Sequence, residues 1–210
     1  IQPGTSLYTK KATPAKYSIT TTNGVASVKA ASTSITGEVV LPKTYNGTNV
    51  TIVEASGFFQ CVNLTKVTLP TDLTIIDEHA FHDCSNLEKV IMPEGLLKIN
   101  QIAFTSSGLI EIKIPTSVQS IGTSAFQNCS KLGSVSFNNN LSQVEEFAVS
   151  VFQDCSALNM ITIPDSIKRI NTNAFINCTS LKNIDLPTKL EFIDSDAFNN
   201  CAGLSYIKLP

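Results

Sequence analysis

The sequence is poor in several residue types, and each shortage narrows the class of protein it can encode. Its 210 residues include no tryptophan, two histidines and two methionines, and only 15% of them are charged. Lysine and arginine (15) nearly balance aspartate and glutamate (17), so we expect no strongly basic surface for nucleic acids or anionic membranes. No apolar run approaches the roughly 18 residues of a transmembrane helix. Hydrophobic residues still make up 42% of the chain, which is too many for a disordered protein.

The cysteines occupy one position of a repeated unit. We interpret the gap of 45 residues between the second and third cysteine as two repeats of 22 and 23 residues, with Ser106 in the missing cysteine slot. The gap of 26 residues that follows predicts an insertion near residues 147–151. The unit has the frame F-x-x-C-x-x-L-x-x-[VI]-x-[apolar]-P, as in residues 81–93 and 175–187. The six cysteines are Cys61, Cys84, Cys129, Cys155, Cys178 and Cys201.

Each unit predicts two short strands and a turn. The frame ends in alternation, so we expect Val90 and Met92 to face one way and Ile91 the other. The proline that follows ends the strand because it has no N–H to donate. A second apolar pair, such as Leu96 and Ile99, predicts a second extended segment. The x-x-A-F-x-x-C part is long enough for about one turn of helix, which we expect to be 3₁₀.

The repeated frame resembles the leucine-rich repeat of the BspA-like bacterial surface proteins, also called the Treponema-type leucine-rich repeat. The resemblance covers about residues 53–210. It implies an α/β leucine-rich-repeat solenoid that is rich in strands and has short helical or 3₁₀ turns. Such a solenoid would have about six to seven 23-residue repeats and an N-terminal β cap. The resemblance also implies an extracellular or cell-surface location, although the N-terminal residues show no secretory signal.

We divide the chain into three parts. Residues 1–16 have no period and are predicted to be a tail or linker. Residues 17–52 are predicted to form an N-terminal cap, with a hairpin around Asn23-Gly24 and a degenerate first repeat. Residues 53–210 are predicted to form the leucine-rich repeats. Because the chain stops at Pro210 without a cap, we expect either that the natural protein continues or that this coil associates with itself or another molecule in solution.

The cysteines raise three alternatives, which are disulfides, a metal-binding array and free thiols. Stacked equivalent positions are close enough for disulfides, but their Cβ atoms point in parallel directions. The close C-x₂-C pairs that are typical of zinc sites do not occur in the sequence. We therefore expect buried free thiols that behave as small apolar side chains.

No catalytic motif stands out. The sequence has no G-x-S-x-G, Walker or G-x-G-x-x-G pattern. His79 and His82, with acidic neighbours, could be metal ligands, or they could be surface positions where other repeats carry Thr, Ser, Asn or Gln. A single repeat cannot easily place three ligands around one ion. We therefore expect no catalytic residue, no metal and no cofactor, and we rank a metal- or thiol-dependent enzyme last among the alternatives.

The outward positions of the main strands are the candidate binding site. They form two parallel stripes of mixed charge with a few exposed apolar groups, and Met and Tyr favour protein interfaces. The alternative is a solvated sheet on which apolar residues are scattered singly. The candidate partner-binding residues are Lys66, Lys89, Ile91, Glu111, Lys113, Met160, Thr162, Asn183, Asp185, Tyr206 and Lys208.

Together with the resemblance, these patterns predict a non-enzymatic protein-binding module of a bacterial cell-surface or secreted protein. We expect it to mediate adhesion to host or matrix proteins, or to other cells, through the strand face of the solenoid. We expect no nucleic-acid partner and no membrane insertion. The alternative function is a structural spacer within a larger surface protein.

Overall fold

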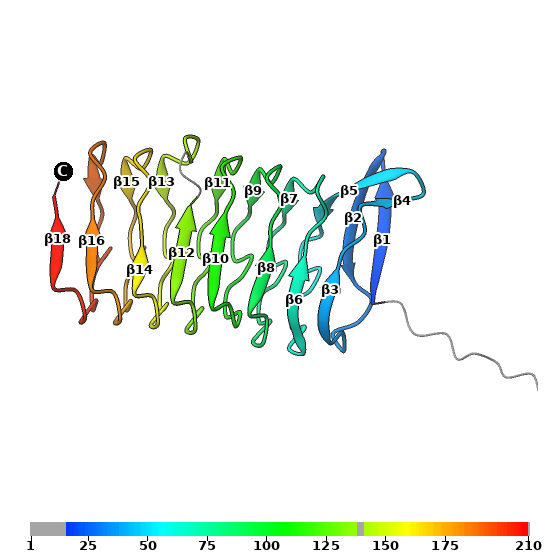
Figure 1. Ribbon diagram of the computed structural model, residues 1–210, viewed down its shortest axis with the longest axis horizontal. Coiled ribbons are helices and arrows are strands. Elements are labelled where there is room, and N and C mark those ends of the chain that lie inside the picture. The colour runs from blue at the N-terminus through cyan, green and yellow to red at the C-terminus, as the bar shows by residue number, and fades with distance from the viewer. Residues whose placement is uncertain (1–15, 138–140, 210) are drawn as a thin grey trace, which may run out of the picture.

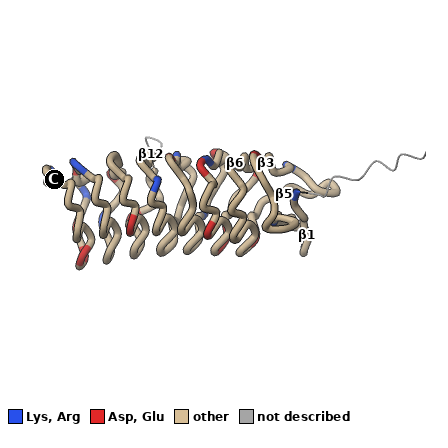
Figure 2. Tube along the Cα trace, turned by 90° about the horizontal axis from the view of Figure 1, so that it is seen from below, with Lys and Arg blue, Asp and Glu red and all other residues tan. Residues whose placement is uncertain are grey.

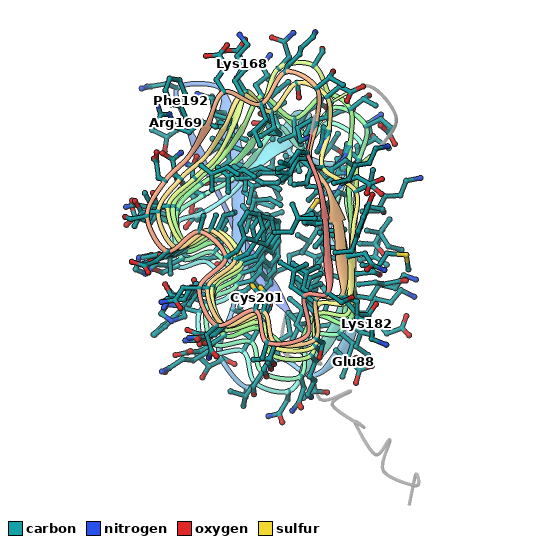
Figure 3. All side chains as sticks on the ribbon, turned by 90° about the vertical axis from the view of Figure 1, so that its left-hand side faces the viewer. Glu88, Lys168, Arg169, Lys182, Phe192 and Cys201 are labelled. Carbon is teal, nitrogen blue, oxygen red and sulfur yellow. The ribbon has the colours of Figure 1, made fainter. Side chains whose placement is uncertain are left out.

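The chain winds into stacked coils that form a straight row (Figure 1). The computed structural model describes residues 16–137 and 141–209, and the predicted tail over residues 1–16 lies almost wholly outside this range. Each coil gives one strand to a front wall and one to a back wall, and the apolar core fills the space between the walls (Figure 3). The fold is therefore the predicted strand-rich solenoid.

The front wall contains the longer strand of each coil. Its strands form three hydrogen-bonded groups, in the orders β3-β6-β8, β10-β12-β14 and β16-β18, and every pair is parallel. We call the outward surface of this wall the strand face. The strands are β3 (Gly37–Val40), β6 (Leu64–Thr68), β8 (Lys89–Ile91), β10 (Glu111–Ile114), β12 (Ser134–Phe137), β14 (Met160–Ile161), β16 (Asn183–Asp185) and β18 (Tyr206–Lys208).

The back wall contains the second strand of each coil. Its parallel strands run in the orders β2-β5-β7-β9-β11 and β13-β15-β17. The strands are β2 (Val25–Ala30), β5 (Thr48–Val53), β7 (Ile75–Ile76), β9 (Lys98–Ile99), β11 (Ser120–Ile121), β13 (Glu146–Phe147), β15 (Arg169–Ile170) and β17 (Phe192–Ile193).

Two antiparallel hairpins close the N-terminal end. Strand β1 (Tyr17–Thr22) pairs with β2 around Asn23-Gly24, and both turn residues have positive φ (52° and 78°). Strand β4 (Thr44–Tyr45) pairs with β5 around Asn46-Gly47. The predicted hairpin at Asn23-Gly24 is thus present, because Asn and Gly both tolerate the left-handed backbone of such a turn.

The core follows the predicted alternation. Val90 is buried and Ile91 is exposed, while Met92 is partly buried against the core. One phenylalanine from each coil stacks on the next, from Phe58 to Phe198, with ring centroids 5.1–5.6 Å apart. Because each coil is one layer thick, its apolar face is covered by the neighbouring coils.

The expected helical or 3₁₀ turns are wrong, since the described residues contain no helix. The segments in question, which we call the turn flank, are residues 54–61, 77–84, 100–107, 122–129, 148–155, 171–178 and 194–201. Two residues in each segment have positive φ, for example His79 (57°) and Asp83 (59°). A 3₁₀ helix needs negative φ at every residue, so these two positions interrupt it. Alternate amides instead donate to the next coil, as Phe81 N–H does to the Ala103 carbonyl oxygen (2.7 Å).

Two details of the repeat also differ from the sequence interpretation. The cysteine slot of the third full coil holds Ser107 and not Ser106, because the Ser107 N–H donates to the Phe104 carbonyl oxygen as each cysteine does in its own coil. This repeat is one residue shorter than the others just after the slot. The chain is tight there, since a Cβ at Gly108 would clash with the Ser85 carbonyl oxygen. The extra residues of the longer repeat fall between Phe137 and residue 141 rather than near residues 147–151, which keep the pairing of the other coils.

Candidate protein-binding face

All eleven predicted binding residues lie side by side on the strand face. Alternation turns the residues before and after each buried strand position outward, and the parallel pairing aligns them between coils. In the register of the parallel strands, Lys66 lies beside Lys89, Asn183 beside Tyr206, and Asp185 beside Lys208. Other aligned pairs on the same face are Thr68 with Ile91, Glu111 with Ser134, Lys113 with Ser136, and Ser134 with Met160.

The exposed fractions identify the groups that a partner could contact. Met160 and Tyr206 protrude most among the predicted apolar residues, with 64% and 53% of their surfaces exposed. Lys66 is only half-buried, while Lys89 and the remaining predicted residues are exposed. The face therefore offers Met160 and Tyr206, and to a lesser extent Ile91, among polar and charged side chains.

Two ion pairs occupy the N-terminal half of this face. Lys66 Nζ lies 2.9 Å from a carboxylate oxygen of Glu38, and Lys89 Nζ lies 3.1 Å from one of Glu111. Both pairs are largely exposed, so each contributes little to stability. These four side chains already have an oppositely charged partner within the chain.

The sequence interpretation missed Glu38 and Val40 on this face. Both lie on β3, and Glu38 is aligned with Lys66 while Val40 is aligned with Thr68. Val40 is exposed over 69% of its surface. The sequence could have identified both residues. The two rows of outward strand positions continue for one more coil into the degenerate repeat at residues 35–42.

The back wall carries its own polar contacts (Figure 3). Arg169 donates from a guanidinium nitrogen to Asp194 (2.7 Å), and its guanidinium carbon lies 4.1 Å from the centroid of the Phe192 ring. Lys168 pairs with Glu145 at 2.8 Å. Lys168, Arg169 and Phe192 lie on the side of the coil opposite Lys182, which marks the strand face. These contacts connect successive coils on the back wall.

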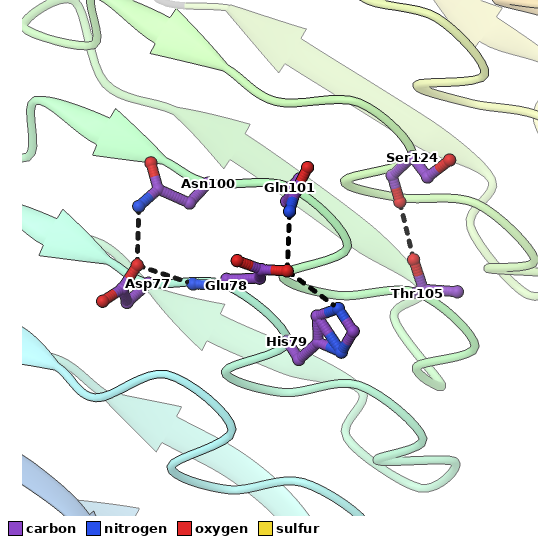
Figure 4. A network of polar contacts seen from close by, with 7 residues as sticks. All are labelled: Asp77, Glu78, His79, Asn100, Gln101, Thr105 and Ser124. Carbon is purple, nitrogen blue, oxygen red and sulfur yellow. Dashed lines mark hydrogen bonds and ion pairs between the residues drawn. The ribbon is translucent and has the colours of Figure 1, made fainter.

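His79 belongs to a polar ladder on the turn flank (Figure 4). His82, which is not part of that view, has its Nε2 atom 3.3 Å from Asp83 Oδ1. His79 Nε2 lies 3.3 Å from Glu78 Oε1, which also accepts a hydrogen bond from Gln101 Nε2 (2.6 Å). Asn100 Nδ2 donates to Asp77 Oδ1 (2.7 Å) in the same way. Within the described residues, no three His, Cys, Asp or Glu side chains are placed to hold a metal ion. The ladder joins one coil to the next.

The six cysteines are free and buried, which confirms the prediction made for them. From the second full coil onward, each thiol donates to a phenylalanine carbonyl oxygen of the preceding coil, as Cys155 Sγ does to Phe126 O (3.1 Å). Burial raises the pKa of every one of these thiols, to about 11 for Cys61 and Cys129. A neutral thiol is a poor nucleophile and a poor metal ligand. We therefore interpret the six thiols as core side chains that pack and donate hydrogen bonds.

Known proteins share this repeat and this fold. A family model described as a BspA-type leucine-rich repeat region of six copies matches residues 51–151 and 145–210. No curated protein matches the chain. Across the described residues, no helix is long and apolar enough to span a membrane.

Three solved structures are similar to the chain. A leucine-rich repeat protein of Bacteroides ovatus is 23% identical with a TM-score of 0.62, over 90% of this chain and 57% of its own. A leucine-rich repeat protein of T. pallidum is 26% identical with a TM-score of 0.63, over 93% and 81%. The pneumococcal vaccine antigen PcpA is 22% identical with a TM-score of 0.54, over 91% and 46%. The chain thus spans little more than half of the first of these proteins and less than half of the third.

Proposed function

Because the chain belongs to the BspA-type leucine-rich repeat family, we propose that it is a non-enzymatic protein-binding module of a bacterial cell-surface or secreted protein. It binds through the strand face, and its partner is a host or matrix protein or a protein on another cell. The family supports a role in protein interaction and a surface location. The choice of partner depends on the side chains of the face and not on the fold.

The observation that carries this proposal is the aligned, exposed array on the strand face. Met160 and Tyr206 protrude from strands that are fixed by parallel pairing to their neighbours. Side chains held on a rigid wall lose little conformational entropy when a partner binds. Methionine and aromatic residues are also enriched in interfaces relative to the rest of a protein surface.

The proposal is tested by a binding screen of the purified chain against matrix proteins and host-cell surface proteins. The same screen is run with the double variant Met160→Asp, Tyr206→Asp, which places two charges on the face. We expect saturable binding to at least one protein, and we expect this variant to lose it.

The matched control is the double variant Thr123→Asp, Ser195→Asp, which adds the same charge at exposed positions of the turn flank. Circular dichroism of both variants checks that the strands are retained. Binding that survives on the strand-face variant, or is lost equally in the control, contradicts the placement of the site.

A structural spacer is the second candidate function, and the straight row of coils in Figure 1 favours it. A row joined by parallel strands keeps its two ends apart whatever lies on its faces. A spacer predicts that no protein in the screen binds saturably and that substitutions on the strand face have no effect on binding.

A further inference from the structure

The charges of the strand face are distributed unevenly along the row of coils. In the N-terminal half, the ammonium groups of Lys66 and Lys89 are paired with the carboxylates of Glu38 and Glu111. A charged partner gains little there, because it would have to displace an existing ion pair.

The C-terminal half has lysines without such partners. Lys113, Lys131, Lys182 and Lys208 are all exposed, and none of them forms an ion pair within the described residues. The carboxylate in their midst is Asp185, which is aligned with Lys208 but forms no ion pair with it. Counting Glu111, which shares β10 with Lys113, four ammonium groups and two carboxylates leave a local net charge of +2, although the whole chain has a net charge of −2.

Neutral and apolar side chains lie between these lysines. Met160 and Tyr206 occupy one row with Asn183 between them, since Asn183 is aligned with Tyr206 and lies on the strand between the other two. Lys182 precedes this row along the chain, and Lys208 follows it two residues after Tyr206. The surface is therefore a row of uncharged side chains, with apolar Met160 and aromatic Tyr206 at its ends and a lysine on each of its sides.

The turn flank has the opposite charge. Its seven segments contain seven carboxylates and no lysine or arginine in the sequence. Figure 2 shows acidic positions at several coil tips on the side opposite β3, β6 and β12, and a further acidic position near β6. This asymmetry gives the molecule an electrostatic orientation, so an acidic partner is attracted to one face and repelled by the other. The seven carboxylates are those of Glu54, Asp77, Glu78, Asp83, Asp154, Asp194 and Asp196.

We propose that the C-terminal half of the strand face binds an acidic segment of a partner protein that carries apolar side chains between its carboxylates. This inference rests on the proposed function, in which the strand face is the binding surface. The lysines pair with the carboxylates, and Met160 and Tyr206 pack against the apolar side chains. An anionic polysaccharide would satisfy the lysines but offers no comparable apolar group for Met160.

The test uses a fluorescent 12-residue peptide in which aspartate and glutamate alternate with leucine, titrated with the full chain. A second peptide has glutamine and asparagine in place of the acids, and heparin represents an anionic polysaccharide. We expect the acidic peptide to bind, to weaken as salt rises, and to bind more tightly than the neutral peptide.

Two variants with equal loss of charge locate the binding site. Lys182→Ser, Lys208→Ser removes two cations from the strand face, and we expect it to weaken peptide binding by about fivefold to tenfold. Lys98→Ser, Lys189→Ser removes two exposed and unpaired cations elsewhere, and we expect a change of less than about twofold. Equal weakening by both variants overturns the inference, because only the net charge then matters.

The remaining outcomes also decide the question. The inference is overturned if the acidic peptide does not bind, if the neutral peptide binds equally well, or if heparin alone binds and loses binding in the strand-face variant. If a partner found in the screen no longer binds Met160→Asp, Tyr206→Asp but still binds Lys182→Ser, Lys208→Ser, the proposed function stands. Only the inference of an acidic partner is then overturned. A partner that neither variant affects overturns the strand-face function itself.

Discussion

Five of the six cysteine thiols, from Cys84 onward, donate to a phenylalanine carbonyl oxygen of the preceding coil. Cys178 Sγ donates to the Phe152 carbonyl oxygen (3.2 Å), and Cys201 Sγ donates to that of Phe175 (3.1 Å). A phenylalanine carbonyl can accept both this S–H and the N–H three residues ahead because it has two lone pairs. The thiol is therefore small enough for the core and still satisfies a buried backbone group, which a methyl group does not.

The burial of the thiols predicts their reactivity. In the folded chain at pH 8, we expect iodoacetamide to modify none of the six cysteines on a timescale of minutes, because burial blocks access and raises their pKa values. In denaturant, all six are modified, as mass spectrometry counts directly. Cys201 is the first to react under native conditions, since it lies in the last coil and is 9% exposed. Rapid modification of Cys155 in the native state contradicts the structure.

The same pKa shifts predict how stability depends on pH. A thiol in the unfolded chain ionises near pH 8.5, whereas the pKa of Cys129 is raised to about 11 by burial, against the effect of its hydrogen bonds with Ser107. The unfolded state therefore loses thiol protons first, and the stabilisation is present below about pH 8.5 and is lost as the pH rises toward 11. We expect the midpoint of urea unfolding to fall between pH 8 and pH 10 in reducing buffer. The fall is smaller in Cys129→Ala, and an equal fall in both proteins contradicts the assignment to thiols.

One residue of the turn flank has an unfavourable backbone. Ile102 has φ of 58°, although left-handed backbone is costly for a β-branched residue. The equivalent positions in other coils carry residues such as Ser124, Asn173 and Asp196, and asparagine and aspartate tolerate this conformation.

This strain predicts a stabilising substitution. We expect Ile102→Asn to raise the free energy of unfolding by about 1 kcal/mol, measured by urea denaturation, because asparagine relieves the strain at a half-buried site. Ile102→Val is the control, and it leaves the strain in place because valine is also β-branched. A lower stability for Ile102→Asn than for Ile102→Val would mean that the side-chain packing outweighs the backbone.

Two single-residue features were not assigned correctly from the sequence, namely the residue in the empty cysteine slot and the place of Glu38 on the strand face. The spacing of the cysteines placed Ser106 in the empty slot, because spacing alone cannot tell on which side of the slot a residue is missing. The hydrogen bond of Ser107 and the close approach of Gly108 to Ser85 locate the missing residue after the slot. Glu38 was overlooked for a related reason, since its repeat lacks the phenylalanine and cysteine that identify the others.

Among the elements, the phenylalanine stack extends through every full coil. Phe175 stacks on Phe152 and Phe198, with centroid distances of 5.5 and 5.2 Å, and it meets Phe147 edge-on at 5.7 Å. Removing one ring therefore leaves a cavity between two layers, which the neighbouring coils cannot fill by moving independently.

We expect Phe175→Ala to lower the free energy of unfolding by about 3–5 kcal/mol, because it deletes a fully buried ring. Thr123→Ala, at an exposed position of the turn flank, should change it by no more than about 0.5 kcal/mol. Urea denaturation of both variants gives the comparison. Equal effects would show that the assignment of inside and outside positions is wrong.

The strands were predictable and the turn flank was not, for one physical reason. Apolar alternation and the terminal proline specify a short strand, as at Val90 and Ile91. The turn flank is set instead by positive φ at positions such as Asp83 and Asn177, and by amides that donate to another coil. Those hydrogen bonds connect residues about 23 positions apart. The spacing of residues within one segment, which is compatible with a 3₁₀ turn, therefore does not reveal them.

At the scale of the whole molecule, the last coil leaves apolar side chains uncovered. Leu209 and Ile207 are 71% and 42% exposed, and Ile193 on the back wall is exposed as well. We expect a polypeptide of residues 1–210 to associate with itself through these side chains at high concentration, since neighbouring exposed apolar side chains favour association.

Sedimentation velocity tests this association. We expect the average mass to rise with concentration for the unaltered chain and to stay monomeric for Ile207→Lys, Leu209→Lys. The control is Val25→Lys, Val149→Lys, which changes exposed valines away from the last coil and should still associate. A monomeric mass at all concentrations for the unaltered chain contradicts the expectation.

The hydrogen bonds between coils run along the length of the row, as from Leu69 N–H to the Ile91 carbonyl oxygen (3.0 Å). Tension applied to the two ends therefore loads these ladders in series, and the coils come apart one at a time by unzipping. Each released coil of 23 residues adds roughly 75 Å of extended chain. Under a pulling force the chain would therefore lengthen stepwise, and the weakest ladder would set the force at which the first coil is released.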